Sequence, residues 1–500
     1  MAANMIHRTH RQQPPSAGRQ IRSVIAALCL IVSFTEAATA SDPYKLPSLG
    51  DGSSSIVSPQ MEAKIGSAFL KQINAAVPMA EDVLIQYYVE QHIQNLAQYS
   101  DMQQPLQAIV VVDNPNINAF AAPGGIIGIN LGLLMYAEDV AEYSSVIAHE
   151  MAHLSQRHFA RGIQAQQAAS VPTMIGFLPA ILVGAAGGSD AGLAALTTAQ
   201  AIGQSNQLRF SREREQEADR VGISTLVRAD IDPNGMARMF ERMQQAYRFT
   251  KRPPEFLLTH PLSESRISDA KNQARRHGEA EAIDPVLALD YQIARIRAQQ
   301  TYSDNPAFDI TNFRKWLTQA PEDLAMKYGL ALALSRADQH DEALQLAEAL
   351  YRHNPQSVLY IGAYAELLIN AARTAEAYEL LDRALSFYPD SYPLSMLYAQ
   401  ALIVDQEYAG AERIYKQISR QRPLDSQVWF ELAETSGLAG NVVDVHLARA
   451  EFFYLNGAPH RAIQHLEYAK NLVAGGNRQL HAKLTQRIQN LRTEIRSIQG

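Results

Sequence analysis

A spacing of 34 residues in the C-terminal third limits the possible fold of this 500-residue chain more than any other feature. Prolines recur at this spacing, and alanines recur at it in two further registers. The matching positions are Pro321, Pro355, Pro389 and Pro423, then Ala331, Ala365, Ala399 and Ala433, then Ala343, Ala377 and Ala411. Small residues let antiparallel helices approach closely, and proline ends a helix because it cannot continue the hydrogen-bond ladder. The period therefore predicts an all-α solenoid of stacked helix pairs.

The 34-residue period is typical of tetratricopeptide repeats, and we expect a repeat domain over residues 321–490. The fourth unit departs from the pattern, since Val445 stands where an alanine is expected, and another helical pair follows around Gly457. Residues 281–320 are predicted to form a linker and a degenerate helical pair that includes Tyr291–Tyr302.

The first forty residues predict a secretory signal peptide. Four arginines and no acid precede the apolar residues 23–34, and Ala38-Thr39-Ala40 follows as a cleavage site. The apolar run is shorter than the roughly 20 residues that span a membrane, and an uncleaved anchor is the alternative. Cleavage after Ala40 removes the single cysteine, Cys29, which fits the Gram-negative periplasm as the compartment.

The charge balance excludes one class of partner. A formal net charge of −7 leaves no basic excess for binding nucleic acid, so we expect no such partner. Residues 41–59 are predicted to be a flexible lead-in, and residues 60–280 an α+β domain, mostly helical with a small sheet. Within this domain, residues 60–100 have helical spacing, 109–112 read as a buried strand, and 118–129 as a second strand or hairpin.

Residues 164–207 form an unusual apolar segment within this domain. Two prolines and four glycines among residues 171–188 argue against a membrane-spanning helix. Three interpretations remain open: a lid or helical hairpin, a peripheral contact with a membrane surface, or buried core. A loop is expected over residues 251–261.

Residues 149–153 read HEMAH, the HExxH motif, in a stretch of helical pattern that continues past His158. Residues four apart share a helix face, so His149 and His153 can bind one Zn²⁺ together. Glu150 stands beside the first ligand and can act as a base without binding the metal itself. His158 falls off the shared face of a continuous helix, and we expect it to be structural.

A second motif, which is acidic, can supply a third protein ligand for the metal. Residues 211–222 read SREREQEADRVG, which places Glu215 and Asp219 on one face of another helix. A catalytic zinc needs a third protein ligand, and Glu215 can complete a His₂Glu site. Asp219 can accept the free ring N–H of a ligand histidine and orient that ring. The alternative for this segment is a charged, solvated helix face.

The order HExxH, ExxAD and a later His-Pro segment resembles the HtpX-like and CAAX-prenyl-protease-like zinc metallopeptidases. This resemblance implies a zincin-type fold and one Zn²⁺ per chain, bound by His149, His153 and Glu215, in a gluzincin-type metalloendopeptidase with Glu150 as the base. Residues 118–125 resemble the family's edge strand, which pairs with extended substrate. The implied substrate-binding residues are Asn118, Ala119, Phe120, Gly124 and Gly125.

His260-Pro261, with Arg266 after it, resembles the family's His-Pro element near the metal. Three roles for His260 remain open: donation of a hydrogen bond to the oxyanion, occupation of the open zinc position in an inactive state, or neither.

A signal peptide, this peptidase and C-terminal repeats together are similar to the beta-barrel assembly-enhancing proteases. The resemblance implies a zinc-dependent endopeptidase of the periplasm, soluble or peripheral, that degrades misfolded or stalled outer-membrane proteins. The repeats would dock these unfolded clients or the beta-barrel assembly machinery. The main alternative is a chaperone or assembly factor whose peptidase is largely latent, and a zinc-dependent hydrolase of other substrates is a third possibility.

Overall fold

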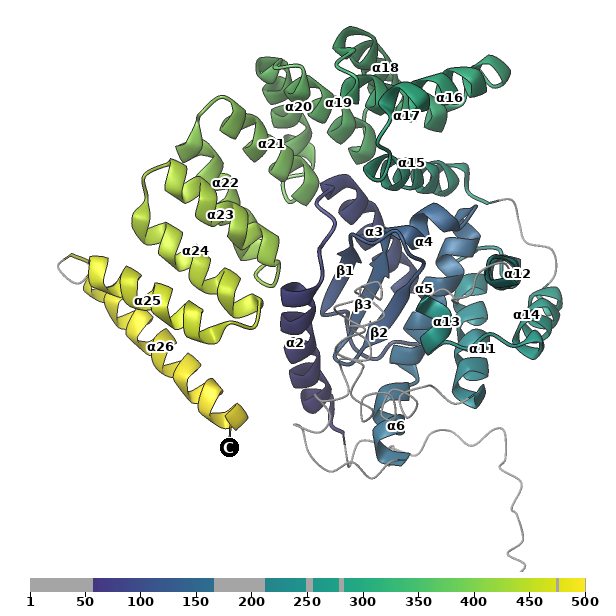
Figure 1. Ribbon diagram of the computed structural model, residues 1–500, viewed down its shortest axis with the longest axis horizontal. Helices are drawn as coiled ribbons and strands as arrows, with labels where there is room; N and C mark the ends of the chain where they lie inside the picture. The colour runs from purple at the N-terminus through teal and green to yellow at the C-terminus, as the bar shows by residue number, and fades with distance from the viewer. Residues whose placement is uncertain (1–56, 166–211, 249–254, 278–282, 474–475, 500) are drawn as a thin grey trace, which may run out of the picture. The chain divides into compact units, whose positions relative to one another are not determined.

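The computed structural model describes residues 57–165, 212–248, 255–277, 283–473 and 476–499. All of these belong to one compact unit, Ser53–Gly500. The predicted signal peptide, most of the lead-in and nearly all of the apolar segment lie outside the described residues. We call residues 57–277 the N-terminal region and residues 283–499 the repeat region (Figure 1).

Two helices open the N-terminal region, and each begins at a polar cap. Helix α2 spans Pro59–Ala76, with the Ser58 side chain accepting a hydrogen bond from a first-turn N–H and proline at the first helical position. Helix α3 spans Val83–Ala97, and Asp82 Oδ1 accepts from two N–H groups of its first turn. Apolar residues at helical spacing on α2 and α3 are buried against the sheet and the following helices.

The sheet has three strands, β1 (Ala108–Val112), β2 (Ala119–Ala122) and β3 (Ile126–Asn130), in the order β1-β3-β2. Strand β1 pairs parallel with β3, and β2 pairs antiparallel with it. The turn between β2 and β3 needs glycine, because Gly124 and Gly125 have φ of +81° and +80°. The prediction of a mostly helical α+β fold with a small sheet is confirmed, and β2 forms one edge of the sheet.

Helices α4 (Leu131–Tyr136), α5 (Val140–Ser155) and α6 (His158–Ala165) follow the sheet. Asp139 caps α5, which is buried from Val140 to His153 and packs against β2 and α3. Between α5 and α6, Arg157 takes a φ of +50°, which breaks the helix. The helical pattern predicted past His158 is present in α6, but this break separates α6 from α5.

Four helices complete the N-terminal region: α11 (Arg212–Arg228), α12 (Asn234–Arg248), α13 (Glu255–Thr259) and α14 (Glu264–Arg276). Helices α11 and α12 pack on α5, and α14 packs on both of them. The short helix α13 occupies part of the predicted loop over residues 251–261, so this prediction is wrong there. Phe256 explains the helix, because its ring is buried in the core beside α5.

The repeat region consists of helices that pack on their neighbours in sequence, as Figure 1 shows. They are α15 (Pro285–Thr301), α16 (Pro306–Gln319), α17 (Leu324–Arg336), α18 (His340–His353), α19 (Val358–Asn370), α20 (Thr374–Phe387), α21 (Tyr392–Val404), α22 (Tyr408–Gln421), α23 (Ser426–Leu438), α24 (Val442–Leu455), α25 (Pro459–Val473) and α26 (Arg478–Gln499). The alanines of both registers are buried between these helices. The predicted all-α solenoid is confirmed.

Polar contacts join the repeat region to α2 and α3. Lys71 Nζ lies 2.9 Å from Glu494 Oε1, and Asn74 Nδ2 donates to the Leu455 carbonyl at 3.2 Å. Near α3, Arg422 Nη1 donates to a carboxylate of that helix at 2.8 Å. The first two helices of the N-terminal region are thus held by residues that follow them in the sequence by about 330 to 420 positions.

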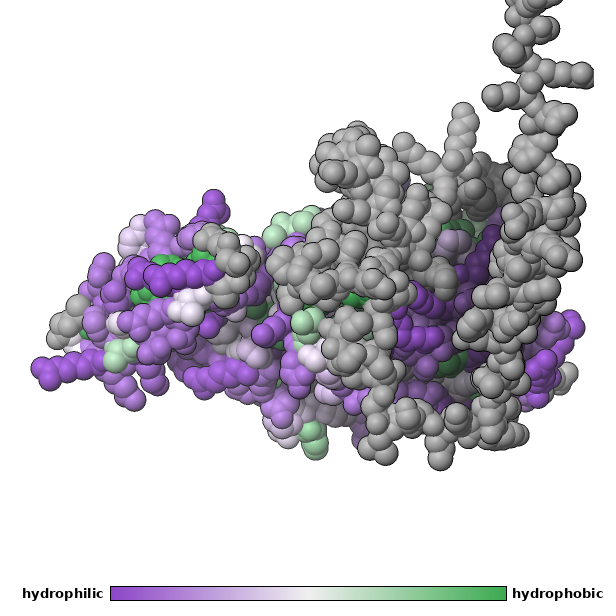
Figure 2. Space-filling model, turned by 90° about the horizontal axis from the view of Figure 1, so that it is seen from below, coloured by the Kyte–Doolittle hydropathy of each residue, from purple (hydrophilic) through white to green (hydrophobic). Residues whose placement is uncertain are grey.

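Among the described residues, no helix combines the length and the apolar character needed to cross a membrane. Figure 2 shows that the helices of the last repeats, at the left of that view, carry mostly hydrophilic side chains with small separate hydrophobic patches. This face offers no broad apolar surface over those helices.

Candidate metal centre

Helix α5 presents two buried imidazoles to the same point. His149 and His153 are one turn apart, and their Nε2 atoms lie 3.0 Å from each other. Two imidazole nitrogens cannot both present lone pairs to each other at this distance unless a proton or a cation lies between them. The contact is satisfied either by a ring N–H of one histidine that donates to the other ring, or by a cation bound between the two nitrogens.

Helix α11 brings a carboxylate to this point. Glu215 is buried, with one oxygen 3.5 Å from His149 Nε2 and the other 3.5 Å from His153 Nε2. Gly222 permits the close approach of α11 to α5, because a Cβ there would lie 3.2 Å from the backbone of Ala148 and His149. The predicted third ligand thus lies beside both histidines.

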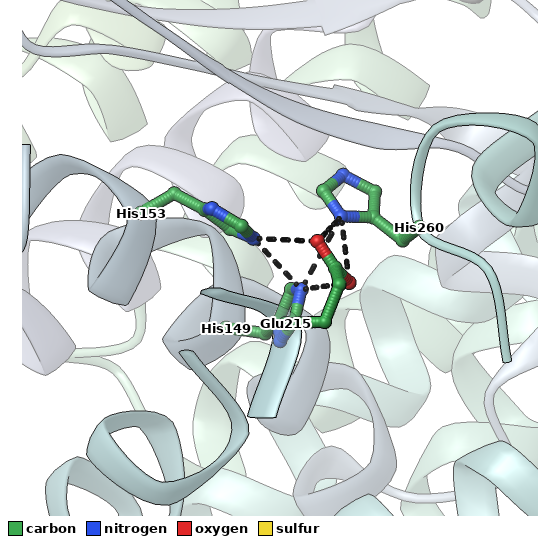
Figure 3. Close-up of side chains that lie close together, drawn as sticks. All are labelled: His149, His153, Glu215 and His260. Carbon is green, nitrogen blue, oxygen red and sulfur yellow. Dashed lines mark hydrogen bonds and ion pairs between the residues drawn. The ribbon is translucent and has the colours of Figure 1, made fainter. Parts of the chain in front are cut away.

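His260, directly after α13, is the fourth member of the cluster. Its Nδ1 lies 3.2 and 3.3 Å from the two oxygens of Glu215 and 3.4 Å from His149 Nε2, as Figure 3 shows. The ring stacks on Phe256 of α13, with centroids 4.7 Å apart. The helix that the sequence did not predict is therefore the element that positions His260.

The spacing of these four groups fits a tetrahedral metal ion. Zinc bonds of 2.0–2.1 Å imply ligand atoms about 3.3 Å apart in a tetrahedron. The contacts of His149 with His153, Glu215 and His260 run from 3.0 to 3.5 Å, and one donor atom from each of the four residues lies within 4.8 Å of the others. Nitrogen and carboxylate donors in this number suit zinc.

Asp219 supports the first histidine from behind. Its Oδ1 lies 2.9 Å from His149 Nδ1, close enough for this carboxylate to pair with the ring. Arg266 donates to both oxygens of Asp219 at 2.7 Å and reaches Glu215 at 2.9 Å. The sequence placed Arg266 near the metal but did not reveal that it binds two of the predicted site residues.

The electrostatics of the cluster favour a cation. Burial alone disfavours a charged His149, but hydrogen bonds to Asp219 and Glu215 raise its pKa to about 9. Burial would likewise raise the pKa of Asp219, yet hydrogen bonds from Arg266 and His149 hold it below its ordinary value. Carboxylates that stay ionised around buried imidazoles create the negative field that a dication neutralises.

His158, which we expected to be structural, contacts the second histidine. Its Nδ1 lies 2.9 Å from His153 Nδ1, and its Nε2 lies 3.1 Å from Glu217 of α11. Helical spacing could not reveal this contact, because it depends on the left-handed backbone at Arg157, which no sequence pattern marks.

Glu150 lies in the position of a free base. Its carboxylate is buried, and Oε1 makes no hydrogen bond within the described part of the chain, while His260 Nε2 is 3.4 Å away. A carboxylate oxygen that is buried without a donor is costly, and a water molecule in the site would satisfy it. Glu150 is therefore placed to accept a proton from such a water.

A cleft of about 70 Å³ leads from the sheet edge to the cluster. It is lined by Gly124, Gly125 and neighbouring residues of the turn after β2, and by His153 and the end of α5. The other predicted edge-strand residues do not line it. Phe120 packs edge-to-face on Phe69 in the core, and the Asn118 carbonyl accepts from β3.

Comparisons with known proteins identify relatives of both regions of the chain. The model of peptidase family M48 matches residues 84–274, and a tetratricopeptide repeat model matches residues 368–433. The chain is 30% identical to the beta-barrel assembly-enhancing protease of Yersinia pestis over 449 residues, 89% of this chain and 91% of that protein. It is 29% identical to its Escherichia coli K12 counterpart over 482 residues, covering 95% and 97% of the two chains. A mitochondrial metalloendopeptidase of Schizosaccharomyces pombe is 31% identical over 180 residues, 36% of this chain and 50% of that protein.

Proposed function

This chain belongs to the beta-barrel assembly-enhancing proteases, and from this premise we propose that it cleaves misfolded or stalled outer-membrane proteins in the periplasm. It is a metalloendopeptidase, and we propose zinc as its metal. The convergence of His149, His153 and Glu215 beside the buried carboxylate of Glu150 is the observation that carries the proposal.

Each residue of the site has its own role in peptide hydrolysis. His149, His153 and Glu215 would hold the metal, which when bound lowers the pKa of water and polarises the scissile carbonyl. Glu150 accepts a proton from the attacking water through its buried Oε1 and returns it to the leaving amine. Arg266 lies 2.9 Å from the carboxylate of Glu215 and holds it in place.

The substrate would bind in an extended form. Among the described residues β2 pairs with β3 alone, so its other edge can add a peptide strand next to the cleft. Backbone pairing selects extended chain rather than a particular sequence, which suits locally unfolded clients. We propose that the repeats bind these clients or the beta-barrel assembly machinery. A peripheral contact of the protein with a membrane surface is compatible with either partner.

The central test is Glu150→Gln in the full chain, measured as zinc per chain together with casein cleavage. Cleavage should fall by roughly 10² to 10⁴-fold while zinc stays bound, because the variant loses a base and not a ligand. Glu213→Gln, on the exposed side of α11, is the matched control and should change neither quantity. Undiminished cleavage by Glu150→Gln would refute the assignment.

His260 favours a second candidate function, an assembly factor or chaperone whose peptidase is largely latent. Its Nδ1 lies within the ligand cluster, where it would take the metal position that a water needs. If His260 holds the enzyme inactive, His260→Ala raises basal cleavage, whereas loss of cleavage would instead assign it to the oxyanion. Outer-membrane assembly that persists in Glu150→Gln would support the assembly role of the repeats.

A further inference from the structure

The break between α5 and α6 returns a histidine to the metal cluster. In a continuous helix, His158 would lie about 140° around the axis from His153, five residues earlier. The left-handed backbone of Arg157 ends α5 and reverses this direction, so that His158 Nδ1 comes within 2.9 Å of His153 Nδ1. The His158 side chain is fully buried, and this contact is therefore shielded from water.

The hydrogen-bond directions along this contact are fixed by the metal centre. His153 turns Nε2 toward the cluster, so a bound metal leaves the ring proton on Nδ1. That N–H donates to His158 Nδ1, which places the proton of His158 on its Nε2. The Nε2–H of His158 in turn donates to Glu217 at 3.1 Å, and Arg161 holds the Glu217 carboxylate at 3.0 Å.

The two histidines of α5 thus have different supports. His149 is backed directly by a carboxylate that an arginine binds, Asp219 with Arg266. His153 is backed by the pair Glu217 and Arg161 through one additional imidazole. A supporting carboxylate ordinarily accepts a hydrogen bond directly from the histidine that binds the metal. Here His158 lies between His153 and the carboxylate of Glu217, across the break between α5 and α6.

We propose that His158 is a positioning residue, which with Glu217 fixes the ring orientation and tautomer of His153 and thereby strengthens metal binding. The proposal rests on the metal centre of the proposed function. It assigns α6 a role in the site, since the first residue of α6 holds a metal ligand of α5. It also gives the left-handed backbone at Arg157 a role in the site, while the Arg157 side chain binds Glu62 and the Val57 carbonyl.

The test is zinc affinity in the full chain, measured by competition with a chromogenic chelator. His158→Phe should weaken zinc binding 10 to 100-fold, because His153 loses its acceptor. His158→Asn should recover most of the affinity, since its Oδ1 can take the place of Nδ1 as acceptor. Glu217→Leu, at a half-buried position, should weaken binding in the same direction and remains informative if His158→Phe does not fold.

A second readout separates positioning from general damage. The visible spectrum of the cobalt-substituted chain should change in His158→Phe and return toward that of the unchanged chain in His158→Asn. His446→Phe removes one member of a histidine pair in the repeats whose Nδ1 atoms are also 2.9 Å apart, and should leave zinc affinity unchanged.

Zinc affinity equal to that of the unchanged chain in Glu217→Leu and in folded His158→Phe would overturn the proposal. So would an Asn variant as weak as the Phe variant. The zinc affinity and casein cleavage of the unchanged chain test the proposed function, whereas the ratio between variants tests the role of His158. The two can therefore fail separately.

Discussion

The N-terminal region and the repeat region bury different kinds of side chain. In the N-terminal region the described core contains the charged or ionisable residues Glu62, His92, Glu142, His149, Glu150, His153, His158, Glu215, Asp219, His260 and Arg266. Of Asp, Glu, His, Lys and Arg residues, the described core of the repeat region contains only Arg297 and Glu412. The repeats are stabilised by apolar contact between neighbouring helices, and the site by charges that neutralise one another. Their responses to substitution should therefore differ.

The chain allows the two regions to be followed separately. Both tryptophans, Trp316 and Trp429, lie in the repeat region, so their fluorescence reports its unfolding. Hydrogen exchange of the amides of α5 reports the N-terminal region. The predictions below run from the largest expected effect to the smallest.

Arg266→Leu should cause the largest loss, about 3–5 kcal/mol in the free energy of opening of α5. The variant leaves the buried carboxylates of Glu215 and Asp219 without their cation, and an uncompensated buried charge is strongly destabilising. Hydrogen exchange of α5 measures the effect, while tryptophan fluorescence should show little change. A loss below 1 kcal/mol would contradict the view that paired charges hold this region together.

Acidification should weaken the N-terminal region through His92. Burial lowers its folded pKa to about 4 from 6.5, so the stability that neutral His92 provides is complete above pH 6.5. It is lost as the pH falls from 6.5 to 4, because the unfolded chain binds the proton first. The loss is about 3 kcal/mol for this group. His92→Gln should remove this part of the pH dependence, and an unchanged slope would contradict the prediction.

Ala377→Leu should destabilise the repeats by about 1–3 kcal/mol, since added side-chain volume forces tightly packed helices apart. Ala377 is fully buried between the helices, whereas Ala375 of the same helix is exposed. Ala375→Leu is therefore the matched control and should have almost no effect on the tryptophan unfolding transition. Equal effects of the two substitutions would show that close helix packing does not limit stability here.

Arg352→Leu should have the smallest effect, no more than about 0.5 kcal/mol. Arg352 pairs with Glu348 at 2.6 Å on α18, but 73% of its side chain is exposed. Water and salt screen such a pair, in contrast to the pair between Arg266 and Asp219. A larger loss in the tryptophan transition would mean that surface charges matter in the repeats as well.

Sequence reasoning predicted the repeats well because their structure is set by neighbours in sequence. The alanines at 34-residue spacing mark helix contacts directly, and every helix of a pair lies close to the next along the chain. The ligand cluster could be predicted from the sequence for a related reason. One helix face carries His149 and His153, and another carries Glu215 and Asp219. That these two helix faces meet was inferred from the need of a catalytic zinc for a third protein ligand, and not from the spacing of the residues.

The features that the sequence did not reveal depend on tertiary packing. Helix α13 forms where Phe256 fits the core, although the segment reads as a loop. The contacts of Arg266 with Asp219 and Glu215 join positions 47 and 51 residues apart in sequence, which no local pattern encodes. The contact of His158 with His153 was not foreseen because a continuous helix was assumed, and one left-handed residue changes the direction of the chain.

The contact of α2 with the end of the repeat region has a consequence for biosynthesis. Lys71 and Asn74 emerge from the ribosome long before Glu494 and Leu455, so an early helix must wait for its last partners. Long-range contacts of this kind raise the contact order and slow folding. A chain that ends before α24 leaves part of the surface of α2 uncovered. The packing of α2 is therefore complete only after the last helices of the chain have been synthesised.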